Sequence, residues 1–128
     1  KIMKNQENIH TVTTAEFEVL KALSSMMYAE YGYSDINLPQ LVKNLDKKYK
    51  GTKTVDVKKL RGTLGSLAKK NLITVFDHSY DYVNGTITKE DKLQYTEYYL
   101  KEHICGMVDI WKEEAIEYGY GTPTFIVQ

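Results

Sequence analysis

The sequence has little from which to build a covalent or membrane-embedded framework. Its 128 residues include one cysteine, two prolines and eight glycines. A single cysteine, Cys105, excludes an internal disulfide and fits a reducing compartment. No apolar run approaches the ~20 residues that span a bilayer, and no secretory signal pattern opens the sequence. We therefore expect one cytoplasmic domain, without a linker, a low-complexity tract or an internal repeat.

Residue patterns typical of catalysis or metal binding are also scarce. His103 and Cys105 form the only close His/Cys pair, and two ligands do not complete a zinc site. Gly119 and Gly121 precede an apolar run rather than a helix, so no phosphate-binding loop is predicted. The carboxylates are scattered, with no pair suited to acid–base catalysis. The sequence therefore predicts no enzyme, metal or cofactor, and Cys105 is interpreted as a small core residue, with redox sensing as the lesser alternative.

Charge is abundant but unevenly distributed. The chain has 17 basic and 17 acidic residues, which gives a net charge of zero. Between Lys43 and Lys70 there are ten basic and two acidic residues, so this window is net +8 and the remainder is net −8. Clustered positive charge attracts polyanions, because neutralising phosphates releases condensed counterions. The same window holds the clearest helical pattern of the chain, which makes nucleic-acid binding the leading hypothesis.

Hydrophobic spacing predicts two helices before this window. The first opens with Thr13 and Glu16, a capping box, and should run to about Glu30. The second is short and begins near Asn37, with Pro39 in its first turn, where the missing N–H is harmless. Its buried side is expected to contain Leu38, Leu41, Val42 and Leu45.

A third helix is predicted over Asp56–Asn71, after a long lysine-rich connection at residues 46–55. At ~100° per residue, four apolar residues share one face and small or basic residues share the opposite one. The apolar face holds Val57, Leu60, Leu64 and Leu67. The outward face holds Lys58, Gly62, Gly65 and Lys69.

Strand signals follow this helix. Leu72–Asp77 has good strand propensity, and Asn84-Gly85 is the strongest short signal for a tight hairpin turn. A return strand is expected within Thr86–Tyr95. The wing formed in this way is not basic, so we expect it to contact DNA weakly.

The ends of the chain are assigned separately. Residues 1–12 are expected to be a polar arm, residues 13–95 the main domain, and residues 119–128 a tail. A helix is predicted over Thr96–Tyr118, although Gln94–Tyr99 also alternates well enough for a strand. Its apolar stripe either closes the core or forms the seam of a homodimer, and both alternatives stay open. The stripe contains Leu100, Ile104, Met107, Val108, Trp111 and Ala115.

This order of elements resembles the winged helix-turn-helix superfamily, including regulators of the MarR and PadR type. The most specific stretches are Leu60–Val75 (LRGTLGSLAKKNLITV), similar to a recognition helix running into a wing strand, and Leu93–Glu97 (LQYTE), similar to a second wing strand. The resemblance implies an α+β, mainly α, fold of three helices, a two-stranded wing and a C-terminal helix. The connection at residues 46–55 is longer and more basic than is usual in that superfamily.

The resemblance and the charge together predict sequence-specific binding to double-stranded DNA, with the Asp56–Asn71 helix in the major groove. Arg61 can donate a bidentate pair to guanine, whereas lysines of the preceding connection would contact phosphates. The expected DNA-binding residues are Lys47, Lys48, Lys50, Lys53, Lys58, Lys59, Arg61, Gly62, Thr63, Gly65, Ser66 and Lys69.

Such a protein would be a transcription regulator or a phage or plasmid replication or partition factor. The sequence does not predict whether a small-molecule effector binds. The alternative function is a protein-interaction module of the same shape that docks an acidic partner without binding DNA. Both features also have interpretations without a binding function. Gly62 and Gly65 would then allow tight helix packing inside the protein, and the lysines would form an ordinary solvated surface.

Overall fold

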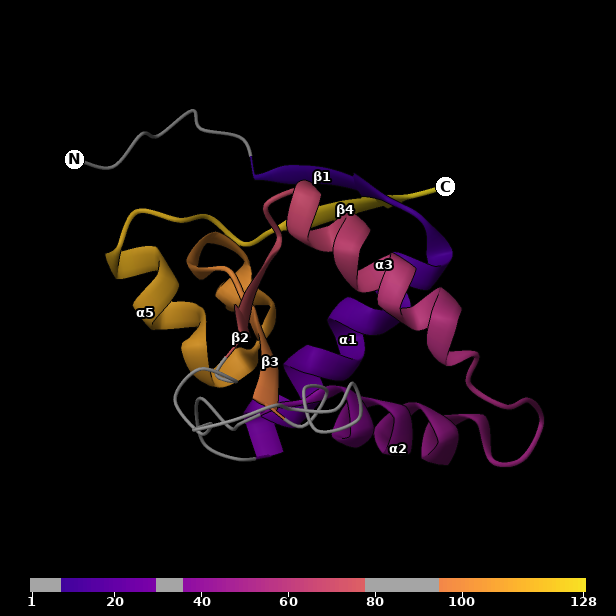
Figure 1. Ribbon diagram of the computed structural model, residues 1–128. Coiled ribbons are helices and arrows are strands. Elements are labelled where there is room, and N and C mark those ends of the chain that lie inside the picture. Colours follow the sequence, from indigo (N-terminus) through magenta and orange to yellow (C-terminus); the bar gives the residue numbers. More distant parts are fainter. Residues whose placement is uncertain (1–7, 30–35, 78–94) are drawn as a thin grey trace.

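A computed structural model describes residues 8–29, 36–77 and 95–128 and shows an α+β chain (Figure 1). After a short N-terminal strand, three helices are followed by an antiparallel strand pair. These elements are α1 (Thr14–Ala29), α2 (Leu38–Tyr49), α3 (Val57–Lys69), β2 (Ile73–Asp77) and β3 (Thr96–Leu100). Within the described ranges, no helix combines the length and the apolar character needed to cross a bilayer.

The three helices begin where side-chain caps were predicted. The N–H of Thr13 donates to Glu16 Oε1 at 2.8 Å, and the N–H of Glu16 donates to Thr13 Oγ1 at 3.1 Å. Asn37 and Gln40 form the same reciprocal box at the start of α2. Asp56 accepts a hydrogen bond from a backbone N–H in the first turn of α3. Each cap satisfies donors that a helix start leaves unpaired, and each contributes about 1 kcal/mol.

The second helix is longer than expected. It ends at Tyr49, and Lys50 closes it in the left-handed conformation at φ 51°. Lys47 and Lys48 therefore lie in its last turn, where positive charge complements the helix dipole, rather than in a loop. The connection to α3 is reduced to residues 50–56, so the predicted long connection at residues 46–55 was wrong.

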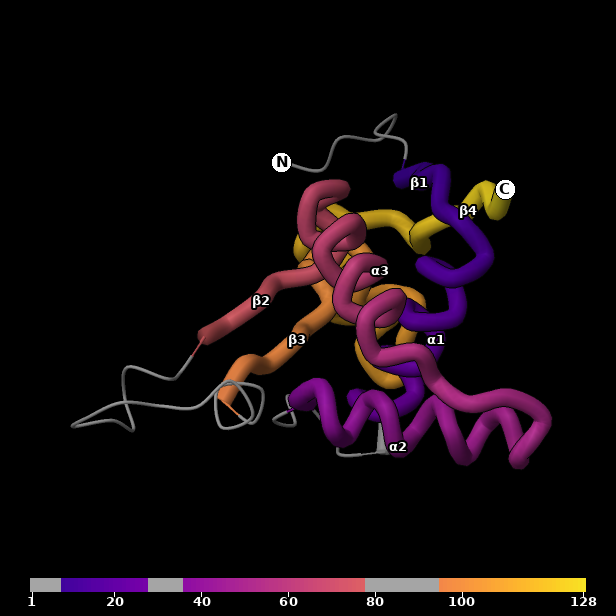
Figure 2. The backbone as a smooth tube through the Cα atoms, turned by 45° about the vertical axis from the view of Figure 1, so that its right-hand side comes forward, coloured from indigo at the N-terminus to yellow at the C-terminus, as the bar shows by residue number. Residues whose placement is uncertain are grey.

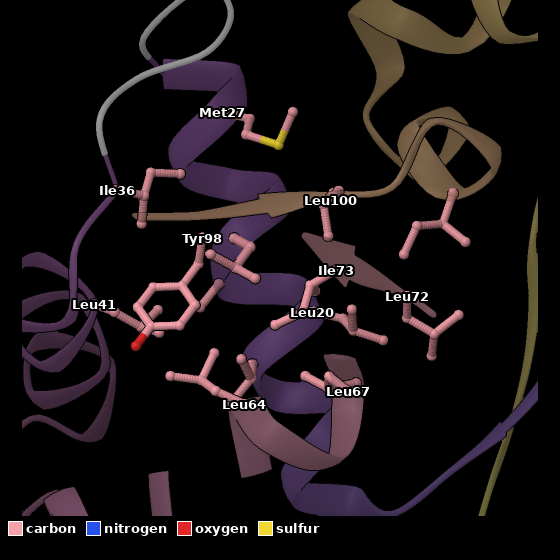
Figure 3. Close-up of a cluster of buried hydrophobic side chains, with 14 of the residues drawn as sticks. Leu20, Met27, Ile36, Leu41, Leu64, Leu67, Leu72, Ile73, Tyr98 and Leu100 are labelled. Atoms are coloured by element: carbon pink, nitrogen blue, oxygen red, sulfur yellow. The ribbon is translucent and has the colours of Figure 1, made fainter. Parts of the chain in front are cut away.

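Buried leucines from all three helices meet the strand pair in one core (Figure 3). Leu20 of α1, Leu64 and Leu67 of α3 and Ile73 of β2 are each at most 2% exposed. Full burial of such a side chain stabilises the fold by about 1.5–3 kcal/mol. The predicted apolar face of α3 is confirmed at Leu60, Leu64 and Leu67. It is wrong at Val57, which is 41% exposed because the first turn of α3 extends past the core.

Strand β3 has partners on both sides. Its register with β2 places Ile73 opposite Leu100. The segment before α2 joins the other edge, where the N–H of Tyr98 donates to the carbonyl of Ile36 at 2.9 Å. The return strand thus begins at Thr96, after the predicted interval Thr86–Tyr95. The predicted Asn84-Gly85 turn lies outside the described residues.

The predicted helix over Thr96–Tyr118 was wrong. After β3 come two short 3-10 helices, η2 (Glu102–Met107) and η3 (Asp109–Trp111), and one short α-helix, α5 (Lys112–Glu117). The tract that opens this segment is rich in tyrosine and pairs with β2, because cross-strand partners outweigh its helical spacing. Further on, Gly106 lies against Ala115 and Pro123, so the chain folds back on itself.

The stripe proposed as a dimer seam belongs to the core of the chain. Leu100, Ile104 and Val108 are at most 3% exposed, and Met107 and Trp111 pack partly buried against the same cluster. Leu100, Ile104 and Val108 therefore offer little surface to a second copy, whereas Met107 and Trp111 are partly exposed.

The two ends of the described chain form a parallel ribbon. Strand β1 (Ile9–Val12), part of the expected polar arm, pairs with β4 (Thr124–Val127) of the expected tail. Asn8 anchors this ribbon, because its side-chain amide donates to the carbonyls of His103 at 2.7 Å and Gly121 at 2.8 Å. Figure 2 shows the ribbon beside α3, on the opposite side of the molecule from α2.

Candidate nucleic-acid interface

The cations predicted to contact DNA are exposed and lie on three consecutive elements. They occupy the last turn of α2, the connection and α3, which follow one another along the chain (Figures 1 and 2). We call this set the basic surface: Lys47, Lys48, Lys50, Lys53, Lys58, Lys59, Arg61 and Lys69.

The outward face of α3 is open along its length. Gly62 and Gly65 are exposed, and a Cβ added at either would meet nothing within 4 Å. The interpretation that these glycines allow tight packing inside the protein was therefore wrong. Lys58 and Lys69 flank them on the same face, since four and seven residues separate positions that stack along a helix. The result is bare helix backbone between two ammonium groups.

No cation of the basic surface forms an ion pair with another residue that the structure describes. Among the described residues, one ion pair is formed, between Lys70 and Glu16 at 2.7 Å. The two acids of the basic window are engaged with backbone: Asp46 accepts from the N–H of Val55 at 3.2 Å, and Asp56 caps α3. These acids shape the connection and the helix start. They do not form ion pairs with the described lysines around them.

The connection is held against α2 by an aromatic contact. The Lys53 ammonium lies 4.2 Å from the centre of the Tyr49 ring, a cation–π geometry. The Tyr49 hydroxyl donates to Glu18 of α1 at 3.0 Å. Burial, then this hydrogen bond and the nearby charges of Glu18 and Asp46, raise the pKa of Tyr49. A hollow of about 250 Å³ lies between Tyr49, Lys53 and Lys59.

A buried carboxylate fixes α3 to α1. Glu16 is 2% exposed and accepts hydrogen bonds from Lys70 at 2.7 Å and from the Ser66 hydroxyl at 2.5 Å. Burial alone would raise the pKa of Glu16. The hydrogen bonds from Lys70, Ser66 and the Thr13 N–H, with the charge of Lys70, outweigh it and leave that pKa lowered. Lys70 also donates to the carbonyl of Thr11 at 3.1 Å, which links α3 to β1.

Two predicted DNA contacts therefore have partners inside the protein. Ser66 is half-buried and directs its hydroxyl to Glu16, and Thr63 is half-buried and donates to the carbonyl of Lys59 at 2.9 Å. Arg61 is exposed, but it lies on the side of α3 that faces β3. Burial raises the pKa of Tyr98, and the guanidinium of Arg61 is near enough to offset part of that rise. The centre of the outward face thus belongs to the two glycines and two lysines.

Sequence reasoning missed the roles of Glu16 and Tyr49. The capping box identified Glu16, but its contacts with α3 reach across some fifty residues and leave no local signal. Tyr49 was assigned to a loop because α2 was expected to end earlier. Comparison of the chain with protein-family models, with curated proteins and with solved structures found no match.

Proposed function

We propose that the chain is a winged-helix protein that binds double-stranded DNA, with α3 in the major groove and the connection on the phosphate backbone. The observation that carries the proposal is the outward face of α3. There, two exposed glycines with open space around them lie between lysines that form no ion pair with any described residue.

The dimensions and chemistry of this face suit a duplex. The major groove, about 12 Å wide, admits an α-helix. Glycine in the middle of a helix destabilises it by roughly 0.5–1 kcal/mol relative to alanine, and close approach of the backbone to another surface is one reason to keep it. Arg61, at the edge of the face, would read guanine. Lys47, Lys48, Lys50 and Lys53 would set affinity through phosphates rather than sequence preference.

The arrangement of the fold supports the same proposal. Three helices followed by an antiparallel strand pair is the order that the winged-helix resemblance implies. The Glu16 hydrogen bonds join α3 and the residue after it to α1, and a helix that is fixed in this way positions a recognition surface better than a loop does. A transcription regulator, or a replication or partition factor, is the role that we infer from such a surface.

The test is fluorescence anisotropy with a labelled random duplex, followed by selection of bound sequences from a random pool. Affinity should fall steeply with salt, because each neutralised phosphate contributes a slope of about −0.9 in log–log form. Selection should yield a consensus with at least one guanine contact. Binding that ignores salt, or no duplex binding at low salt, contradicts the proposal. Binding of a polyglutamate peptide without duplex binding would instead favour docking of an acidic partner.

A further inference from the structure

A second recess lies in the C-terminal region, away from the basic surface. It is a cavity of about 310 Å³ between the end of α1, η2, α5 and the turn that follows α5. Aromatic rings form much of its wall: Trp111, Tyr118 and Tyr120. Buried Met27 and Ala115 close its base with apolar surface. This volume and lining are those of a site for a small organic molecule.

The charged side chains that line this cavity are both acidic. Glu102 and Glu114 line it, and among its described lining residues none is basic. Burial, and then the charges of these two carboxylates, raise the pKa of the Cys105 thiol to about 11. Both carboxylates are therefore near Cys105, which also lines the cavity. The thiol therefore stays neutral at physiological pH and adds no anion. The redox-sensing interpretation of Cys105 loses support for the same reason, since the reactive form is the thiolate.

We propose that this cavity binds a small organic cation with an aromatic or other apolar body. Aromatic faces attract a cation through the ring quadrupole, and a carboxylate pair at the rim neutralises its charge. The apolar base would bury the body of the ligand, whereas an anion would be repelled by both carboxylates. A neutral molecule would gain only the apolar contacts. This site is independent of the proposed DNA binding.

The chain provides its own reporter for the test. Trp111 is the only tryptophan and lines the cavity, so occupancy should change its fluorescence. The probes are benzyltrimethylammonium, neutral benzyl alcohol and anionic benzoate, titrated at constant ionic strength and followed by fluorescence and calorimetry. We expect saturable binding of the cation only. The double variant Glu102→Gln with Glu114→Gln should weaken it by about tenfold or more, since two charges within a few ångströms are lost.

A matched control separates a local site from general attraction. Glu113 and Glu117 lie on α5 with Glu114 and are exposed, as Glu102 and Glu114 are, but neither lines the cavity. Glu113→Gln with Glu117→Gln should leave the cation affinity within about twofold, because these carboxylates do not line the cavity and more distant charges are screened by salt. Equal weakening in both double variants, equal binding of benzyl alcohol, or no saturable change with wild-type protein would each overturn the proposal. The comparison of probes on wild-type protein holds even if a variant fails to fold.

Discussion

The basic surface and the C-terminal region are opposite in charge and are built differently. The first rests on regular, capped helices whose leucines fill one side and whose cations project from the other. The second, residues 95–128, has six acidic and two basic residues and consists of two short strands, two 3-10 helices and one short α-helix. In Figure 1, α5 and the connection after α2 lie at opposite sides of the molecule.

The difference shows how a chain of zero net charge can have two distinct surfaces. A straight helix with a bare outward face can lie along a groove, and the charge beside it is open to a large polyanion. Short turns border a recess instead, and two carboxylates, Glu102 and Glu114, line it. The separation predicts that changes in one region leave the binding properties of the other unaffected.

Charge reversal in each region is the strongest test of this separation. The triple variant Lys58→Glu, Arg61→Glu and Lys69→Glu should reduce duplex affinity on the order of 100-fold or more, because phosphate attraction becomes repulsion. Anisotropy at fixed salt measures the loss, and circular dichroism checks that the exposed substitutions leave the fold intact.

The matched control reverses three exposed acids of the C-terminal region: Asp109→Lys, Glu113→Lys and Glu117→Lys. It should leave duplex affinity unchanged or raise it slightly through the more positive net charge. Loss of affinity in the control, or none in the basic-surface variant, would show that α3 is not the DNA-binding element. Retained duplex affinity with loss of an acidic peptide ligand would instead support the interaction-module alternative.

The buried acid under the basic surface should govern stability rather than binding. Glu16→Gln removes a carboxylate that accepts from Lys70 and Ser66, and should lower the free energy of unfolding by roughly 1–3 kcal/mol. The folded-state pKa of Glu16 lies below its ordinary value of 4.5. The unfolded chain therefore binds this proton more tightly, so the contribution is present above about pH 4.5 and is lost as the pH falls through the folded-state pKa.

Urea unfolding of both proteins from pH 7 to pH 3 measures this effect. The difference in unfolding free energy should narrow below about pH 4.5. The exposed Glu113→Gln variant serves as the control and should match wild type within about 0.5 kcal/mol at every pH. If the difference in unfolding free energy between Glu16→Gln and wild type does not change with pH, the packing of the side chain, and not its charge, accounts for that difference.

The glycines of α3 offer a variant in which stability and binding should change in opposite directions. Gly62→Ala with Gly65→Ala should stabilise the protein by about 0.5–1 kcal/mol per site, because each new methyl group enters open space within a helix. The same methyl groups should hold the backbone away from base edges and weaken duplex binding several-fold. Thermal unfolding and anisotropy on one preparation test both halves.

Gly106 is the counterpart in the C-terminal region. A Cβ there would lie 3.5 Å from Ala115 and from Pro123, in ordinary contact, so Gly106→Ala should leave duplex affinity unchanged. Stabilisation without weaker binding in the α3 double variant would mean that DNA does not approach those glycines.

The two regions also differ in how far their structure can be predicted from the sequence. The caps of α1, α2 and α3 and the core leucines of α3 follow from local patterns, because helix starts and helix faces are encoded within a few residues. The β1–β4 ribbon joins Ile9 to Thr124, and no local signal marks such a pair. The 3-10 turns were taken for a helix because Leu100, Ile104 and Val108 recur every four residues, a spacing that a strand end and two tight turns also satisfy.

The candidate site shows the same division. Exposure of the lysines, and the two glycines on one face of α3, could be predicted from helical geometry. The hydrogen bond from Ser66 to Glu16 could not be predicted in this way, because it depends on how α1 and α3 pack. Sequence patterns therefore identify what a helix presents, and tertiary contacts decide which of those groups remain free for a ligand.

Exposed apolar residues give the smallest expected effect and test whether this division holds. Val57 belongs to the predicted apolar face of α3 and Ile110 to η3, and they are 41% and 46% exposed. Val57→Ser and Ile110→Ser should each change the unfolding free energy by no more than about 0.5 kcal/mol, whereas Leu64→Ala and Ile104→Ala should each lower it by roughly 2–5 kcal/mol. Chemical denaturation of the four variants measures the contrast. A large loss at Val57 alone would mean that the first turn of α3 is covered in solution.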